Sequence, residues 1–248
     1  QKGFVDTRKL DAALSDLRLN TRMSAQELEK FYHLSNDLAK ELGVSTEAIL
    51  RQAAALSKLG ITTAESAAQL TELGIRFAAI SPGMDAGKAT ASLADIMQAY
   101  KISASDASDG ILSKINEVGH RFQTSNAEIA EGLQKSSAAM AGAGETIETT
   151  IGLFAGGQEV IRDASEVGEA IRSIALRMQA CDSETGMLSG NLADLAEQVA
   201  ELTKTAGNRG GISLFADSSR TEPKDMLTLL GEFSEIWSEL DANSRTDL

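Results

Sequence analysis

Residues 125–148 read SNAEIAEGLQKSSAAMAGAGETIE: a helix start, a helix body and a corner in succession. Ser125 with Glu128 three positions later has the spacing of a capping box, in which a side-chain oxygen accepts from a free backbone amide at the helix start. The alanine-rich residues that follow favour helix. Gly142-Ala143-Gly144 then predicts a tight corner. The stretch therefore predicts two neighbouring helices joined by a short link.

The same start signal recurs along the chain. The capping spacing is found again at Thr62 to Glu65, Ser103 to Asp106 and Asp163 to Glu166, and Ser45 offers a further cap. Corners are predicted at Gly43-Val44, Pro82-Gly83 and Gly156-Gly157. We expect helices near 46–58, 63–79, 86–100, 104–121, 126–142, 145–156 and 163–180. Because the links between them are short, neighbouring helices should run antiparallel.

Apolar residues before position 43 follow a heptad pattern. One phase holds Leu10, Leu17, Phe31 and Leu38, and the other holds Leu14, Leu28 and Leu42. This pattern predicts a packed helical hairpin or a coiled coil. It is interrupted at Thr21 and Ser24, and Ser24 with Glu27 has the capping spacing, so two helices are expected. Unless this seam folds back on the rest of the chain, its apolar area predicts a homo-oligomer.

The character of the sequence changes after Ala180. Glycines bracket one helix near 191–205, and residues 211–216 have strand character, so at most one small β-hairpin is expected near 211–222. Pro223 suits the first turn of a last helix, whose apolar face continues to Leu240. The predicted fold is all-α: a multi-helix antiparallel array or bundle. Its predicted parts are an N-terminal helical, coiled-coil-like segment (1–41), a helical core (42–180) and a C-terminal part (181–248).

Composition supports helix and excludes several classes of protein. The 248 residues include two prolines and 4% aromatics, a balance that favours helix over sheet. The net charge of −13 disfavours binding to nucleic acid and to anionic membranes. The longest uncharged run, Thr149 to Gln158, is about half of what a membrane span requires. Because the chain begins Gln1-Lys2-Gly3 without an initiator Met, we expect a fragment of a longer protein.

The residues capable of chemistry do not form a recognisable site. His33 and His120 have no second ligand at metal-binding spacing, and the single cysteine, Cys181, is interpreted as an unreactive thiol. Glu145 and Glu148 are interpreted as a solvated helix start rather than as an acid and base. Nucleotide-binding and hydrolase motifs are absent from the sequence. We therefore expect no catalytic residue, no cofactor and no metal.

The order of these elements resembles the core region of phage tail tape measure proteins. The resemblance lies in Leu42-Gly43-Val44-Ser45 through Ala64, then Asp85 to Tyr100, Ser125 to Ile129, Ala141 to Glu148 and Gly168 to Arg172. Residues 211–215 and 229–240 resemble the segment that follows this core in phage and prophage proteins. The resemblance covers about residues 42–248. The hydrolase modules of some family members have no counterpart here, so it implies a structural role without enzymatic activity.

The family implies a location and a set of partners. A tape measure protein lies in the lumen of the tail tube of the virion, sets tail length, and leaves when DNA is ejected. The implied partners are the tail tube protein, tail assembly chaperones and tail-tip or baseplate proteins, met first in the host cytoplasm. Two alternatives stay open: a cytoplasmic helical adaptor or scaffold that binds partner helices in a groove, and an enzyme domain with an unrecognised site. A tape measure protein would be several times longer than this chain, whereas an adaptor would be short and complete.

Overall fold

The computed structural model describes residues 2–21, 23–58, 63–122, 124–181, 184, 186, 190–205 and 207–248. The helices are α1 Lys2–Asn20, α2 Ala25–Leu42, α3 Thr46–Lys58, α4 Ala64–Ala79, α5 Ala86–Tyr100, α6 Ala104–Ala107, α7 Ser113–Phe122, α8 Asn126–Gly142, α9 Ile147–Ile161, α10 Ala164–Met178, α11 Leu192–Leu202, α12 Met226–Ile236 and α13 Ala242–Asp247. A π-helical turn, Ser108–Leu112, joins α6 to α7, and a 3₁₀ turn, Trp237–Glu239, follows α12. No strand occurs in the described ranges, so the all-α prediction is confirmed.

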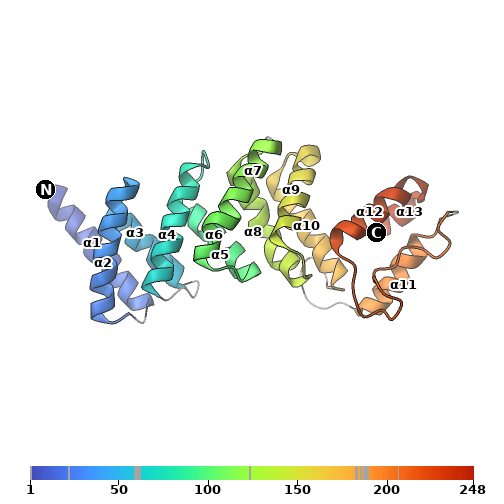
Figure 1. Ribbon diagram of the computed structural model, residues 1–248, viewed down its shortest axis with the longest axis horizontal. Helices are drawn as coiled ribbons and strands as arrows, with labels where there is room; N and C mark the ends of the chain where they lie inside the picture. Colours follow the sequence, from blue (N-terminus) through green and yellow to red (C-terminus); the bar gives the residue numbers. More distant parts are fainter. Residues whose placement is uncertain are drawn as a thin grey trace.

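The helices form an elongated stack. Figure 1 shows α2 to α10 lying across the long axis of the molecule, with the N-terminus at one end and the C-terminal helices at the other. Helix α1 packs mainly on α3, and α2 packs on α3 and α4. Contacts then continue from α4 to α5, from α5 to α8, and from α8 to α9 and α10. The predicted multi-helix fold is confirmed, although α8 and α10 run parallel, with Lys135 paired to Glu169 and Ala139 accepting from Gln179.

Capping explains where most of these helices begin. Ser24 and Ser125 each form a complete capping box, with the Ser hydroxyl accepting from the amide of Glu27 or Glu128 and the Glu carboxylate accepting from the Ser amide. The predicted caps Ser45, Ser103 and Asp163 also accept from the amide three residues on. For α4 the cap is Thr63, which accepts from the Ser66 amide, while the predicted cap Thr62 lies outside the described residues.

The predicted corner at Gly156-Gly157 is wrong. Helix α9 continues through both glycines to Ile161 and ends at Arg162, whose φ of 59° closes the helix in the left-handed conformation. A Cβ atom on Gly157 would lie 2.7 Å from Cγ1 of Val167 on α10. Gly157 is therefore a site of close helix approach and not a turn.

The heptad seam folds back on the array. The prediction of two helices before residue 43 is confirmed, and Leu17, Phe31 and Leu38 are buried. They share one apolar core with Ile49 and Leu50 of α3 and with residues of α4. Leu10, Leu14, Leu28 and Leu42 pack against the same core but stay partly exposed, so self-association through the seam stays a prediction. The domain limits after residues 41 and 180 stay predictions.

The predicted hairpin near 211–222 is reduced to one isolated antiparallel bridge between Phe215 and Pro223. The interpretation of Pro223 as the first turn of a helix is wrong, because α12 begins at Met226 after the cap Asp225. In the bridge the neighbouring Lys224 amide donates to the Leu214 carbonyl at 2.9 Å. The bridge uses the amide of Lys224 and not that of residue 223, so a proline, which has no amide hydrogen, fits this position.

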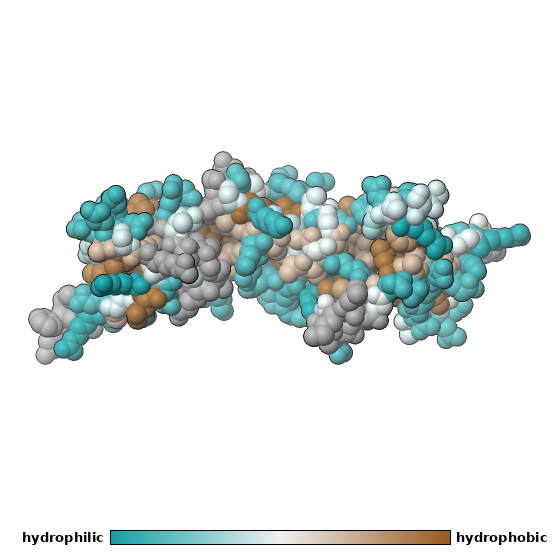
Figure 2. All heavy atoms as spheres, turned by 90° about the horizontal axis from the view of Figure 1, so that it is seen from below, coloured by the Kyte–Doolittle hydropathy of each residue, from teal (hydrophilic) through white to brown (hydrophobic). Residues whose placement is uncertain are grey.

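Three groups of buried apolar residues follow one another along the molecule. The first joins α1 to α4, the second extends from α3 and α4 to α10 and includes Met226 of α12, and the third joins α11, residues 212–215 and α12. On the face shown in Figure 2, hydrophilic side chains dominate and apolar atoms form separate patches. The three groups of buried apolar residues between the helices therefore hold the stack together.

Helices also approach one another closely where α8, α9 and α10 meet. Gly132 of α8 lies beneath the ring of Phe154 of α9, where a Cβ atom would overlap the ring. A Cβ atom on Gly168 of α10 would lie 2.8 Å from the carbonyl oxygen of Gly132. Two glycines thus let the backbones of α8 and α10 approach each other and let the Phe154 ring of α9 lie against α8.

Candidate functional site

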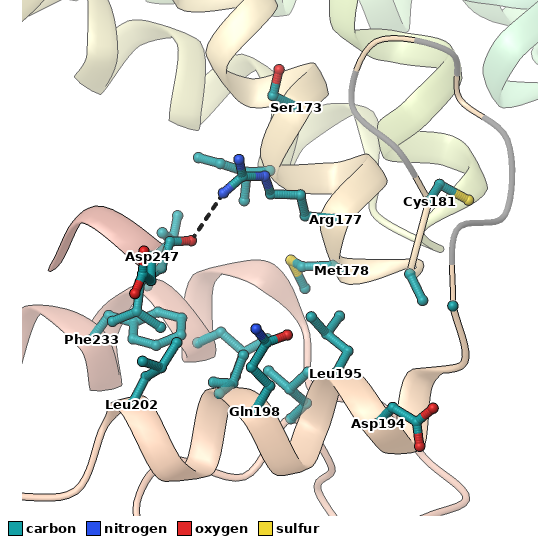
Figure 3. Close-up of a pocket in the computed structure, with 18 of the residues that line it drawn as sticks. Ser173, Arg177, Met178, Cys181, Asp194, Leu195, Gln198, Leu202, Phe233 and Asp247 are labelled. Carbon is teal, nitrogen blue, oxygen red and sulfur yellow. Dashed lines mark hydrogen bonds between the residues drawn. The ribbon is translucent and has the colours of Figure 1, made fainter. Parts of the chain in front are cut away.

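A cleft of about 630 Å³ lies where the stacked helices meet the C-terminal part of the chain. Its walls come from α10, α11, α12 and the last residues, and Figure 3 shows Met178 of α10 above Leu195 of α11. Most of the lining is apolar, including Ile174, Met178, Leu195, Val199, Leu230 and Phe233. The cleft is therefore a mainly apolar contact region between the stacked helices and the C-terminal part of the chain.

One polar contact closes the cleft at its end. The Arg177 guanidinium donates from Nη1 to the carbonyl oxygen of Leu248 at 3.3 Å, drawn as a dashed line in Figure 3. Asp247 and Asp194 also line the cleft, and Figure 3 places them toward opposite ends of it. An acid and a base that work together need to converge on one reacting atom. Figure 3 shows that the Asp194 and Asp247 carboxylates do not converge, so they are not arranged as such a pair.

A second polar contact ties the last helices to the stack. The Glu145 carboxylate accepts from the backbone amide of Met226 at 2.5 Å, at the first residue of α12. The Met226 side chain is fully buried in the same core as α8, α9 and α10. Glu145 therefore satisfies an amide that the start of a helix leaves without a partner. The interpretation of Glu145 as solvated is wrong.

Glu148 has a different role from Glu145. Its carboxylate pairs with the Lys114 ammonium of α7, and hydrogen bonding to that ammonium lowers the pKa of Glu148. The Glu145 carboxylate instead accepts from the amide that begins α12. These two neighbouring acids therefore join separate pairs of elements and do not form an acid–base pair.

The remaining candidates are dispersed. His33 lies exposed in the middle of α2, and His120 lies exposed in the last turn of α7. Cys181 is half-buried at the cleft, with Sγ 3.7 Å from the Gln179 carbonyl oxygen. Within the described ranges, no three His, Cys, Asp or Glu side chains are grouped so that they could hold a metal ion. Among those same residues, no helix combines the length and apolar character that a membrane crossing requires.

The comparison with protein families bears on the whole array. The model of the family described as phage-related minor tail protein matches residues 33–248. The chain belongs to this family. The match begins within α2 and includes the stack, the cleft and the C-terminal helices. No curated protein and no solved structure matches the chain.

Membership in the phage-related minor tail protein family gives the chain a structural role in a phage tail. It also makes the chain a virion component that associates with other tail components. The cleft agrees with such a role because its side chains pack two parts of the molecule together. Sequence reasoning missed the Arg177–Leu248 contact in the cleft, whose residues are 71 positions apart, and the Glu145–Met226 contact outside it, whose residues are 81 apart.

Proposed function

We propose that the chain is the core region of a tail tape measure protein, which sets tail length and around which the tail tube assembles. The observation that carries the proposal is the all-α fold, in a chain of the phage-related minor tail protein family. A protein that measures distance needs a shape whose length follows from the number of its residues. A helical chain has this property, since adding residues adds length in proportion.

The stack adds length at a different rate from a single long helix. An α-helix aligned with the tube advances about 1.5 Å per residue. Helices packed side by side are about 8–10 Å apart, so a pair of about 30 residues in a stack advances about 0.3–0.6 Å per residue. The proposal therefore assigns most of the measured length to axis-aligned helix. The stacked helices form a more compact part of the same protein.

The proposed location is the lumen of the tail tube, which the protein leaves when DNA is ejected. Its proposed partners are the tail tube protein, the tail assembly chaperones and the tail-tip or baseplate proteins. The net charge of −13 supports this location, because an acidic surface repels the phosphate backbone of DNA passing through the same channel. Self-association of the chain stays a prediction, to be tested by light scattering.

The proposal is tested by following the protein through ejection. A short epitope tag inserted at the exposed Pro82-Gly83 turn between α4 and α5 should leave the helices intact. We expect an immunoblot to detect the tag in intact virions and to lose it from virions that have ejected their DNA. The tail tube protein in the same samples is the loading control. A tag absent from virions would favour the helical adaptor, and a tag retained after ejection would contradict the lumen location.

A further inference from the structure

The last helices of the chain have an apolar core of their own. We call the described residues 191–205 and 207–248 the C-terminal unit, and its contact with the stacked helices α1–α10 the joint. The buried residues of this core come from α11, the following loop and α12: Ala196, Ile212, Leu214, Phe215 and Leu229. A Cβ atom on Gly211 would lie 1.8 Å from the carbonyl oxygen of Ala200, so the loop backbone lies directly on α11. The unit therefore has the internal packing of a separate body.

Polar contacts inside the C-terminal unit add to this core. Thr203 is fully buried at the end of α11, and its hydroxyl oxygen accepts from the Ile212 amide at 2.6 Å. The Lys224 ammonium pairs with the Glu232 carboxylate of α12 at 2.6 Å. Hydrogen bonds that are shielded from water are stronger than exposed ones. These contacts join α11, the loop and α12 to one another and not to the stacked helices.

The joint is a much less complete contact. None of the extensive helix packings among the described residues joins α11, α12 or α13 to the stacked helices. The apolar cleft of about 630 Å³ lies between the two parts instead. Parts of a chain that meet through a small and incomplete contact are expected to move relative to each other.

One residue makes both an apolar and a polar contact across the joint. The Met226 side chain is fully buried in the core of the stacked helices, and its amide donates to the Glu145 carboxylate at 2.5 Å. Three positions further along α12, Leu229 is buried in the core of the C-terminal unit. A single turn of α12 thus carries one residue that holds the joint and another that holds the unit.

We propose that the C-terminal unit is a latch on the stacked helices. In the closed state, which is the state of this structure, Met226 and Glu145 fasten it. In the open state the unit leaves the stacked helices as one body with its own core intact, and it uncovers Ile174 and Met178 of α10, which line the cleft. Because Met226 leaves its buried position on opening, its burial and its hydrogen bond set the balance between the two states. The proposal rests on the geometry of the joint and not on the tape measure role.

Two alanine variants of the purified chain test the latch, because they remove buried side chains of α12 from different cores. M226A weakens the closed state alone. We therefore expect the hydrogen–deuterium exchange rate of the amide of residue 226 to rise at least tenfold, with exchange in α11 and in residues 212–215 unchanged. L229A is the matched control. It removes a side chain from the core of the unit, so it should raise exchange in α11 and in residues 212–215.

Cys181 gives a second readout of opening. It is the single cysteine of the chain and lies half-buried at the cleft, so a small aromatic disulfide should react with its thiol faster when the latch is open. We expect E145A and M226A to increase this rate. E145A does so without creating a cavity, because it removes only the acceptor of the Met226 amide. E148A is the control and should leave the rate unchanged, since Glu148 pairs with Lys114 of α7.

The latch is overturned if M226A and L229A raise exchange in the same segments, because the C-terminal unit then has no core that is independent of the joint. It is also overturned if E145A and M226A both leave the Cys181 rate unchanged, or if E148A increases that rate as much as E145A does. These measurements use the chain in solution, so their outcome is separate from that of the ejection experiment.

Discussion

Replacing Gly168 with alanine should force α8 and α10 apart. The new Cβ atom would lie 2.8 Å from the carbonyl oxygen and 2.9 Å from the Cα atom of Gly132. Ordinary contacts between such atoms begin near 3.5 Å, so the Cβ atom is about 0.6–0.7 Å too close. Both contacted atoms belong to the backbone, and no side-chain rotation can relieve the overlap.

The magnitude follows from two opposing effects. Overpacking a well-packed interior costs about 1–3 kcal/mol, and the rigid backbone contact places G168A toward the upper end of that range. Alanine is better than glycine in a helix by about 1 kcal/mol. We therefore expect a net destabilisation of about 1–2 kcal/mol. Gly152 of α9 is the matched control, because a Cβ atom there meets no atom within 4 Å, so G152A should stabilise by about 0.5–1 kcal/mol.

Urea unfolding followed by far-UV circular dichroism measures both variants. The expected order of midpoints is G152A above the unmodified chain and G168A below it. If both alanines raise the midpoint equally, the effect is helix propensity alone, and the close packing of α8 on α10 is refuted. If both lower it equally, the argument from open space at Gly152 fails.

Two further predictions concern the joint and the helix caps. E145A should increase hydrogen–deuterium exchange across α12, because the Met226 amide loses its acceptor. E148A should leave exchange in α12 unchanged, because Glu148 pairs with Lys114 instead. Equal exchange in both variants would contradict the role of Glu145 in holding α12. Hydrogen bonds from Ser125 lower the pKa of Glu128 in the folded chain. The ionised carboxylate therefore stabilises the fold fully above the unfolded pKa of about 4.3, and this contribution is lost as the pH falls through the lower folded pKa. E128Q keeps the capping box without titrating, so we expect a flatter dependence of the urea midpoint between about pH 5 and pH 3; an unchanged slope would contradict this assignment.

Local signals predicted the helix starts well because a cap involves residues only three positions apart. Ser24, Ser125 and Asp163 act in the structure as their spacing predicts. Glycine was harder to interpret, since the same residue serves a turn or a close contact. Gly144 has a φ of 84° and forms the predicted corner, whereas Gly157 lies inside α9 against Val167. Contact with another helix, which the local sequence pattern does not reveal, decides between these roles.

The long-range contacts could not be predicted from spacing. Glu145 joins α12 through an amide 81 positions away, and any local pattern around Glu145 describes only the start of α9. The heptad pattern did identify the buried positions Leu17 and Phe31, while the helices that cover them became clear only from the structure.

Tail length tests the proposed measuring role most directly. A helical insert of about 60 residues, placed before α1 in the protein as the phage expresses it, should lengthen virion tails by about 90 Å if it aligns with the tube, at about 1.5 Å per residue. Electron micrographs of purified virions give the mean length. An increase near this value, and about half of it for half the insert, is the predicted result. Tails of unchanged length would contradict the measuring role.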